Sequence, residues 1–175
     1  MRKVKELALF EDRELLMHIV YLSLGIVAAG LAAVAIMLLA GVPIERFTPF
    51  TLLGVALVTG VALVVHELVH AAFFILMGGW GTRIRFGACD GMLFTEAPGL
   101  ILPVVRFCVV LLAPAVLVTA GLVALGLSLG MPLATVLAAG IHLSGCAGDL
   151  MFLFEIVRAH AAYVEDTGSG IRMYC

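Results

Sequence analysis

The sequence predicts an all-α polytopic membrane protein with four transmembrane helices and a small β-hairpin between the second and the third. The chain has 175 residues, of which 63% are hydrophobic and 13% are charged, whereas a soluble domain has about 45–50% apolar and about 25% charged residues. The mean hydropathy is +1.21. Long apolar runs in so short a chain leave too little polar surface to cover them in water. We therefore expect residues 1–175 to form one membrane-embedded domain.

Each apolar run is long enough to cross a bilayer, which takes about 20 mostly apolar residues in a helix. We place the four spans at about 18–40, 50–77, 104–129 and 133–157. The segment before the first span carries acidic as well as basic residues, unlike the short basic start of a signal peptide. We therefore expect the first span to be retained.

The basic residues predict the orientation of the spans. The chain has 10 Lys and Arg residues. Successive connections lie on alternating sides of the membrane. Of these basic residues, only Arg46 lies in the connection between the first and second spans, and none lies between the third and fourth spans. All the others therefore fall on the side of the two termini. Because Lys and Arg near transmembrane helices stay cytoplasmic, we expect a multi-pass protein of the cell membrane with both termini in the cytoplasm.

The segment between the second and third spans, "TRIRFGACDGMLFTEAPG", predicts a small β-hairpin at about 82–97 on the cytoplasmic side. Polar and apolar residues alternate over 83–86, and the pair Asp90-Gly91 is a turn signal that precedes a second short apolar run. Pro98 and Gly99 end the segment. A plain cytoplasmic loop is the alternative interpretation.

The second span contains the motif "HELVH", which begins at His66 and ends at His70. Residues four apart share one face of a helix, so the two imidazoles can bind one metal ion. Glu67 is rotated by about 100° from His66 and is placed to take a proton from metal-bound water. This is the arrangement of zinc peptidases. The alternative is a pair of buried histidines that are hydrogen-bonded to neighbouring helices.

Asp149 is the candidate for the third protein ligand, because a catalytic zinc site typically has three protein ligands and a water. Asp149 lies as far from residue 133 as His66 lies from residue 50, so the two side chains reach a similar depth in the membrane. A divalent ion would offset the charges of Asp149 and Glu67. We therefore expect one zinc ion, bound by His66, His70 and Asp149. A helix-packing hydrogen bond or a kink at Asp149 is the alternative.

His142 and Cys146 share a helix face with Asp149 in the fourth span. His142 is an alternative ligand, a hydrogen-bonding partner of the substrate, a donor to the transition state, or a buried histidine bonded to a backbone carbonyl, and the sequence leaves these roles open. We expect Cys146 to serve in packing. The four cysteines form no Cys-x-x-Cys pair, so we predict no disulfide framework.

The segments "HELVHAAFFILMGG", "LLAPAVL" and "HLSGCAGDLMFL" resemble a bacterial family of membrane zincin peptidases. The order of elements is more distantly similar to that of the site-2 proteases. The resemblance implies metal binding by His66, His70 and Asp149, with Glu67 as the catalytic base. The chain has no asparagine, so the transition-state asparagine of site-2 proteases has no counterpart. A substitute for it would be one of the residues His142 and Ser144.

These observations predict an intramembrane zinc metalloprotease that hydrolyses peptide bonds of membrane-associated substrates through a metal-activated water. A non-catalytic metal-binding membrane protein, such as a sensor or assembly factor, and a small ion or proton transporter are the alternatives. The expected partners are membrane lipid and a peptide or membrane-protein substrate. The net charge of −2 gives no basic footprint for nucleic acid. The sequence leaves a homo-oligomer open.

Overall fold

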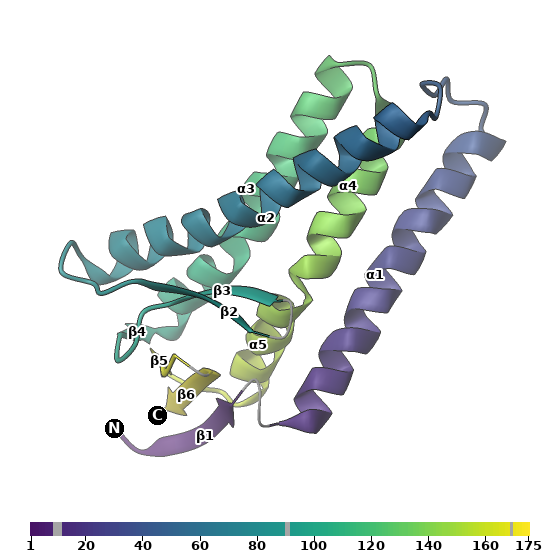
Figure 1. Ribbon diagram of the computed structural model, residues 1–175. Helices are drawn as coiled ribbons and strands as arrows, with labels where there is room; N and C mark the ends of the chain where they lie inside the picture. The colour runs from purple at the N-terminus through teal and green to yellow at the C-terminus, as the bar shows by residue number, and fades with distance from the viewer. Residues whose placement is uncertain (9–11, 90–91, 169) are drawn as a thin grey trace.

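The protein is mostly helical, with short antiparallel strands at one end of the helices (Figure 1). The computed structural model describes residues 1–8, 12–89, 92–168 and 170–175. The elements in this part of the chain are β1 (Lys3–Ala8), α1 (Arg13–Leu39), α2 (Pro49–Gly78), β2 (Arg85–Cys89), β3 (Met92–Glu96), β4 (Ile101–Pro103), α3 (Val104–Ser128), α4 (Pro132–Gly145), α5 (Ala147–Arg158), β5 (Tyr163–Asp166) and β6 (Gly170–Tyr174).

Three helices, α1, α2 and α3, are long and apolar enough to cross a membrane. Large apolar side chains such as Leu39, Phe50 and Val105 are exposed on their outer faces. Since lipid is the solvent that accepts such surfaces, the helices are compatible with a multi-pass membrane protein. α2 packs against α3 and α4, and α1 packs against α4 and α5.

The predicted fourth span is not one continuous helix. α4 ends at Gly145, α5 begins at Ala147, and the two axes are bent by 48° at this break. Sharp bends occur at Gly and Ser pairs, and the break lies in the run Ser144-Gly145-Cys146. The bent pair counts as a fourth span only if both helices are taken together.

The hairpin between α2 and α3 consists of β2 and β3, which pair antiparallel from Arg85 opposite Glu96 to Cys89 opposite Met92. Its turn, which the sequence predicts at residues 90–91, lies outside the described residues. The Thr95 hydroxyl of β3 donates to the backbone carbonyl of Glu67 at 3.0 Å. This hydrogen bond attaches β3 to α2 at the motif. The side of the membrane on which the hairpin lies stays a prediction.

A four-stranded antiparallel sheet of order β1-β6-β5-β4 shows that the all-α prediction was wrong in this respect. The sheet joins the two ends of the chain, since Lys3 pairs with Tyr174 and Ala8 with Gly170. Arg172 links it further through ion pairs with Glu6 at 2.7 Å and Glu165 at 3.2 Å. β1 and β6 pair across almost the whole chain, and β4 and β5 are separated by α3, α4 and α5, so no local sequence pattern indicates these two pairings, whereas β5 and β6 are consecutive strands.

The apolar core lies between this sheet and the adjacent ends of the helices. Its buried members include Leu7 of β1, Phe107 of α3, Ile156 of α5, Val164 of β5 and Met173 of β6. The core therefore fixes α5, and with it Asp149, against the strand-bearing end of the molecule.

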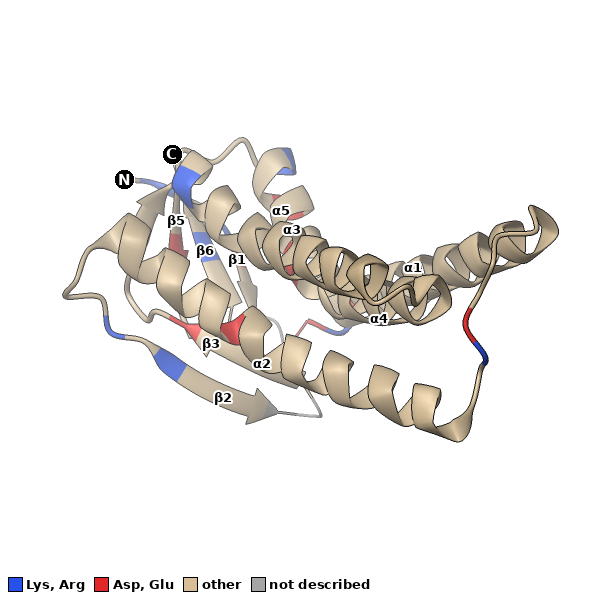
Figure 2. Ribbon diagram, turned by 90° about the horizontal axis from the view of Figure 1, so that it is seen from above, with Lys and Arg blue, Asp and Glu red and all other residues tan. Residues whose placement is uncertain are grey.

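Most Lys and Arg residues lie at the same end as the strands (Figure 2). The exception is Arg46, in the connection between α1 and α2 at the opposite end. The positive charge is therefore concentrated at one end of the helices, the end that carries the strands.

Candidate metal centre

His66 and His70 occupy one face of α2, as their spacing predicts, and both are 6% exposed. Their Nε2 atoms are 3.1 Å apart. Asp149, in the first turn of α5, brings Oδ2 to 3.2 Å from the Nε2 atom of His66 and 3.3 Å from that of His70. The bend between α4 and α5 thus directs the Asp149 carboxylate towards the histidine pair.

The three atoms fit the ligand set of a tetrahedral zinc ion. Zinc lies about 2.0–2.2 Å from nitrogen and oxygen ligands, so two such ligands at the tetrahedral angle are about 3.3–3.5 Å apart. The distances of 3.1 to 3.3 Å are close to this range. Two imidazoles and one carboxylate are also a typical donor set for catalytic zinc.

The other nitrogen of His70 supports this assignment. Its Nδ1 atom is 3.1 Å from the backbone carbonyl oxygen of Val110. Because a carbonyl can only accept a hydrogen bond, the proton of neutral His70 lies on Nδ1 and the lone pair on Nε2. Metal-binding histidines are held by such carbonyl contacts, and no sequence pattern indicates this one, because Val110 lies on a different helix.

Glu67 lies beside the three candidate ligands. Within the described part of the chain, its Oε2 atom is buried and has no hydrogen-bond partner. A buried carboxylate oxygen without a partner is costly. A water bound at the adjacent centre would offer it a proton to accept, which is the role that the motif predicts for Glu67.

Glu67 and the three candidate ligands, His66, His70 and Asp149, line one cavity of about 520 Å³. Consecutive residues of β3, from Met92 to Glu96, form another part of its wall. Phe74, Phe107 and Phe152 contribute apolar surface. The cavity therefore combines polar groups at one place with an apolar lining, as substrate sites typically do.

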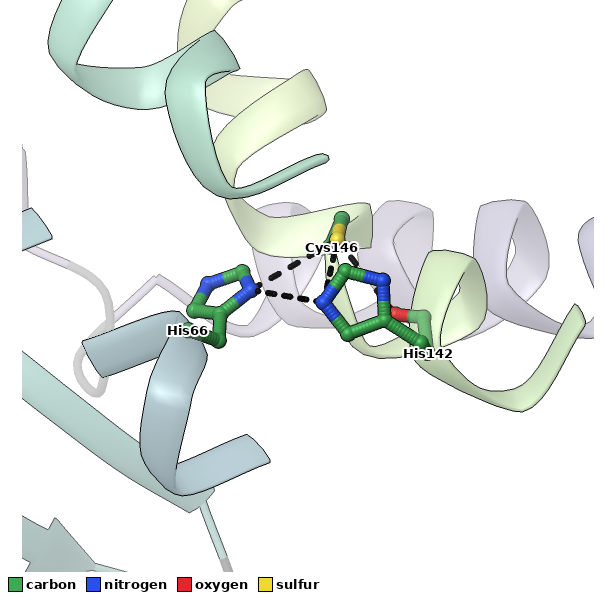
Figure 3. A group of neighbouring side chains, drawn as sticks. All are labelled: His66, His142 and Cys146. Carbon is green, nitrogen blue, oxygen red and sulfur yellow. Dashed lines mark hydrogen bonds between the residues drawn. The ribbon is translucent and has the colours of Figure 1, made fainter. Parts of the chain in front are cut away.

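His142 is fully buried, but it lies on the opposite side of the His66 ring from Asp149. Its Nε2 atom is 3.3 Å from the Nδ1 atom of His66, and its own Nδ1 atom is 3.0 Å from the Thr119 hydroxyl. Figure 3 shows His142 and Cys146 turned towards His66. The sequence interpretation did not include the contacts of Thr119 and Cys146 with these rings, because they join separate helices.

Ser144 lies at the wall of the cavity, and its hydroxyl donates to the backbone carbonyl of Ile141 at 2.8 Å. A serine that bonds its own helix in this way is common in apolar helices. The structure therefore does not bring the Ser144 hydroxyl into the group of three donor atoms, whereas it brings His142 into contact with His66.

The family model described as "Putative zincin peptidase" matches residues 59–164, more than half of the chain. The chain belongs to this zincin peptidase family. The matched region of the zincin peptidase runs from α2 to β5 and contains all the candidate site residues named above. Membership indicates a zinc-dependent metallopeptidase. Comparison with curated proteins and with solved structures gave no match.

Proposed function

We propose that this zincin peptidase is an intramembrane zinc metalloprotease that cleaves peptide bonds of membrane-associated substrates. The observation that carries the proposal is the convergence of His66 Nε2, His70 Nε2 and Asp149 Oδ2 within 3.1 to 3.3 Å of one another. The family assignment supports peptidase chemistry. The likeness to site-2 proteases stays a prediction.

In this proposal His66, His70 and Asp149 hold one zinc ion. When bound, zinc lowers the pKa of a bound water towards about 7 and polarises the carbonyl of the scissile bond. The three ligands come from α2 and α5, two helices that the apolar core and the bend at Cys146 hold in a fixed relation.

Glu67 acts as the general base and then as the general acid. Its Oε2 atom, which has no hydrogen-bond partner among the described residues, accepts a proton from the attacking water. The same oxygen then delivers this proton to the nitrogen of the leaving amine. The hydrogen bond from Thr95 to the Glu67 carbonyl holds this turn of α2 in place.

We place the substrate as an extended peptide beside β3. Residues Met92–Glu96 line the cavity that also contains Glu67 and the candidate ligands. Recognition of an extended peptide alongside a strand uses its backbone groups and needs little sequence specificity. A membrane-spanning substrate would have to unwind locally to adopt this conformation, because helical backbone groups are already paired.

We further propose that residues 1–175 form one membrane-embedded unit of the cell membrane with both termini in the cytoplasm. The charge distribution in Figure 2 and the rule that Lys and Arg stay inside support this orientation. The strand-bearing end and the cavity would then face the cytoplasmic leaflet. One copy supplies all the proposed ligands, so the proposal needs no second copy.

The first prediction concerns Glu67→Gln, which keeps the size of the side chain and removes its basic carboxylate. Purified protein in detergent is compared with the variant for zinc content and for cleavage of a transmembrane peptide. We expect equal zinc and a loss of cleavage of about 100-fold or more, the usual contribution of a general base.

Three outcomes distinguish the proposed metalloprotease from a non-catalytic metal-binding protein and from a transporter. Equal cleavage by wild type and Glu67→Gln would remove the proposed mechanism. Bound zinc without cleavage in either protein would favour a non-catalytic metal-binding protein. Ion flux in liposomes without stoichiometric zinc would favour a transporter.

A further inference from the structure

A second group of metal-ligand atoms lies on the far side of the His66 ring. The Nδ1 atom of His66 is 3.3 Å from the Nε2 atom of His142 and 3.7 Å from the Sγ atom of Cys146. The sulfur is 4.0 Å from the Nε2 atom of His142. All three residues are buried, with His142 and Cys146 at 0% exposure, and Figure 3 shows their donor atoms turned towards one another.

We infer that His66, His142 and Cys146 form a second cation position, which binds a thiophilic divalent ion such as zinc or cadmium. Zinc lies about 2.0–2.1 Å from nitrogen and about 2.3 Å from sulfur, so tetrahedral ligands are about 3.3–3.4 Å apart for two nitrogens and about 3.6 Å for nitrogen and sulfur. The three distances exceed these values by at most about 0.4 Å, a small side-chain adjustment.

The helices preorganise this group. His142 and Cys146 are four residues apart at the end of α4, and they face His66 on α2. The Thr119 hydroxyl, 3.0 Å from His142 Nδ1, can accept the ring proton there, and in this tautomer the Nε2 lone pair is directed at the group. The Cys146 thiol is 3.3 Å from the His142 carbonyl. Cation binding would release the thiol proton to solvent.

The two cation positions exclude each other because they share one ring, an inference that rests on the proposed role of His66 in the first position. A neutral imidazole has a lone pair on one nitrogen and a proton on the other. When Nε2 binds a cation, Nδ1–H donates to His142. When Nδ1 binds a cation, Nε2–H donates to Asp149, 3.2 Å away. Both tautomers of His66 therefore have partners.

The ligand sets also differ in chemical preference. Two imidazoles and a thiolate favour softer cations than two imidazoles and a carboxylate do. A thiophilic cation in the second position would withdraw His66 from Asp149 and His70. The second position therefore predicts inhibition of the peptidase by cadmium, which competes with zinc for His66.

The test measures the ultraviolet thiolate-to-cadmium charge-transfer band during titration of the purified full chain with cadmium. In the parent protein for this test, Cys89, Cys108 and Cys175 are replaced by Ser so that Cys146 is the only thiol. We expect a band that saturates at one equivalent of cadmium. It disappears in Cys146→Ser, and it is lost in His142→Gln, which keeps a hydrogen-bond acceptor for His66 but removes the imidazole.

Asp149→Asn is the matched control, because it removes a ligand of the first position only and its amide oxygen still accepts from His66. We expect the cadmium band to persist in this variant. With one equivalent of zinc, X-ray absorption should show only nitrogen and oxygen ligands in the parent protein and a sulfur ligand in Asp149→Asn.

Absence of the band in the folded parent protein, or its persistence in His142→Gln, would overturn the second position. If the three serines prevent folding, the native chain and Cys146→Ser alone are compared for the same band. Circular dichroism verifies folding of each variant. Because the band is read without peptide cleavage, its absence leaves the proposed peptidase intact, and absence of cleavage leaves the band interpretable.

Discussion

At the scale of single residues, His66 has a partner for each ring nitrogen. Nε2 faces His70 and Asp149, whereas Nδ1 faces His142 and Cys146. The environment of this ring therefore decides which cation position is used. The carbonyl of Val110 fixes His70 in one tautomer, but no comparable constraint fixes His66.

A prediction at the same scale concerns Asp166, which is 7% exposed and lies at the end of β5, at the wall of the cavity. Burial raises the pKa of Asp166 to about 6, although backbone hydrogen bonds from Gly168 and Ala97 favour the carboxylate. The folded state therefore binds this proton more tightly than the unfolded chain does. The contribution to stability is complete below about pH 4 and is lost as the pH rises through about 6.

Asp166→Asn, which keeps an acceptor for the Gly168 N–H, should remove this loss. We expect the variant to gain stability over wild type between pH 4 and pH 6.5, by at most about 3 kcal/mol from the two-unit shift. The difference should be constant above that range. Thermal unfolding in detergent at several pH values measures it. A difference that does not change with pH would show that the Asp166 pKa is ordinary in the folded state.

At the scale of elements, the sequence located the long helices well. The predicted spans 50–77 and 104–129 correspond to α2 (Pro49–Gly78) and α3 (Val104–Ser128), because an unbroken apolar run leaves a helix few alternatives in lipid. The first helix begins earlier than predicted, at Arg13, where Asp12 caps it by accepting from the Leu15 N–H at 3.0 Å. Because the first turn of this helix is polar, hydropathy alone does not indicate where the helix begins.

Non-local features could not be predicted in the same way. The sheet that joins β1 to β6 depends on contacts between the two ends of the chain. The bend between α4 and α5 lies close to Asp149, where the sequence indicates a kink only as an alternative. The proximity of Asp149 to the histidine pair agrees with the depth count, because α2 and α4 begin at the same end of the molecule and helices rise equally per residue. The contacts of His142 could not be predicted from the sequence, because they join three helices: His142 of α4 contacts His66 of α2 and Thr119 of α3.

A prediction at this scale concerns the contact between α3 and α4. A Cβ atom on Gly126 would lie 1.8 Å from the Thr135 Oγ1 atom, so Gly126→Ala should force the helices apart and cost about 1–3 kcal/mol. Gly121→Ala is the matched control, because its Cβ would meet nothing within 4 Å in the described part of the chain. This control should be neutral or slightly stabilising.

Thermal unfolding in detergent compares the two alanine variants. A third protein, Gly126→Ala with Thr135→Ala, should recover part of the loss, because the hydroxyl at 1.8 Å is removed while the Cβ atom of residue 135, 2.8 Å from the added Cβ, remains. Equal unfolding temperatures for Gly126→Ala and Gly121→Ala would contradict the close approach of the two helices.

At the scale of the whole molecule, most basic residues and the strands lie at the same end of the helices. The strands, both termini and most basic residues lie at one end of the helices, and the connection that contains Arg46 lies at the other (Figures 1 and 2). In the proposed orientation, the cavity is reached from the cytoplasmic half of the membrane. A substrate would therefore enter beside β3 at the strand-bearing end.

Labelling of intact cells tests this orientation. Cys175 is exposed at one end of the molecule, and Phe47 is exposed in the connection between α1 and α2. With the remaining cysteines replaced by Ser, a membrane-impermeant maleimide should label Phe47→Cys from outside. It should label Cys175 only after the membrane is permeabilised. The reverse pattern would invert the orientation.

The most direct measurement of the central proposal is an anomalous difference map at the zinc absorption edge, from crystals grown with one equivalent of zinc. We predict one peak at about 2.0–2.2 Å from His66 Nε2, His70 Nε2 and Asp149 Oδ2, the usual zinc–ligand distances. A map without a peak at these three atoms, with zinc bound only elsewhere on the protein, would contradict the proposed metalloprotease.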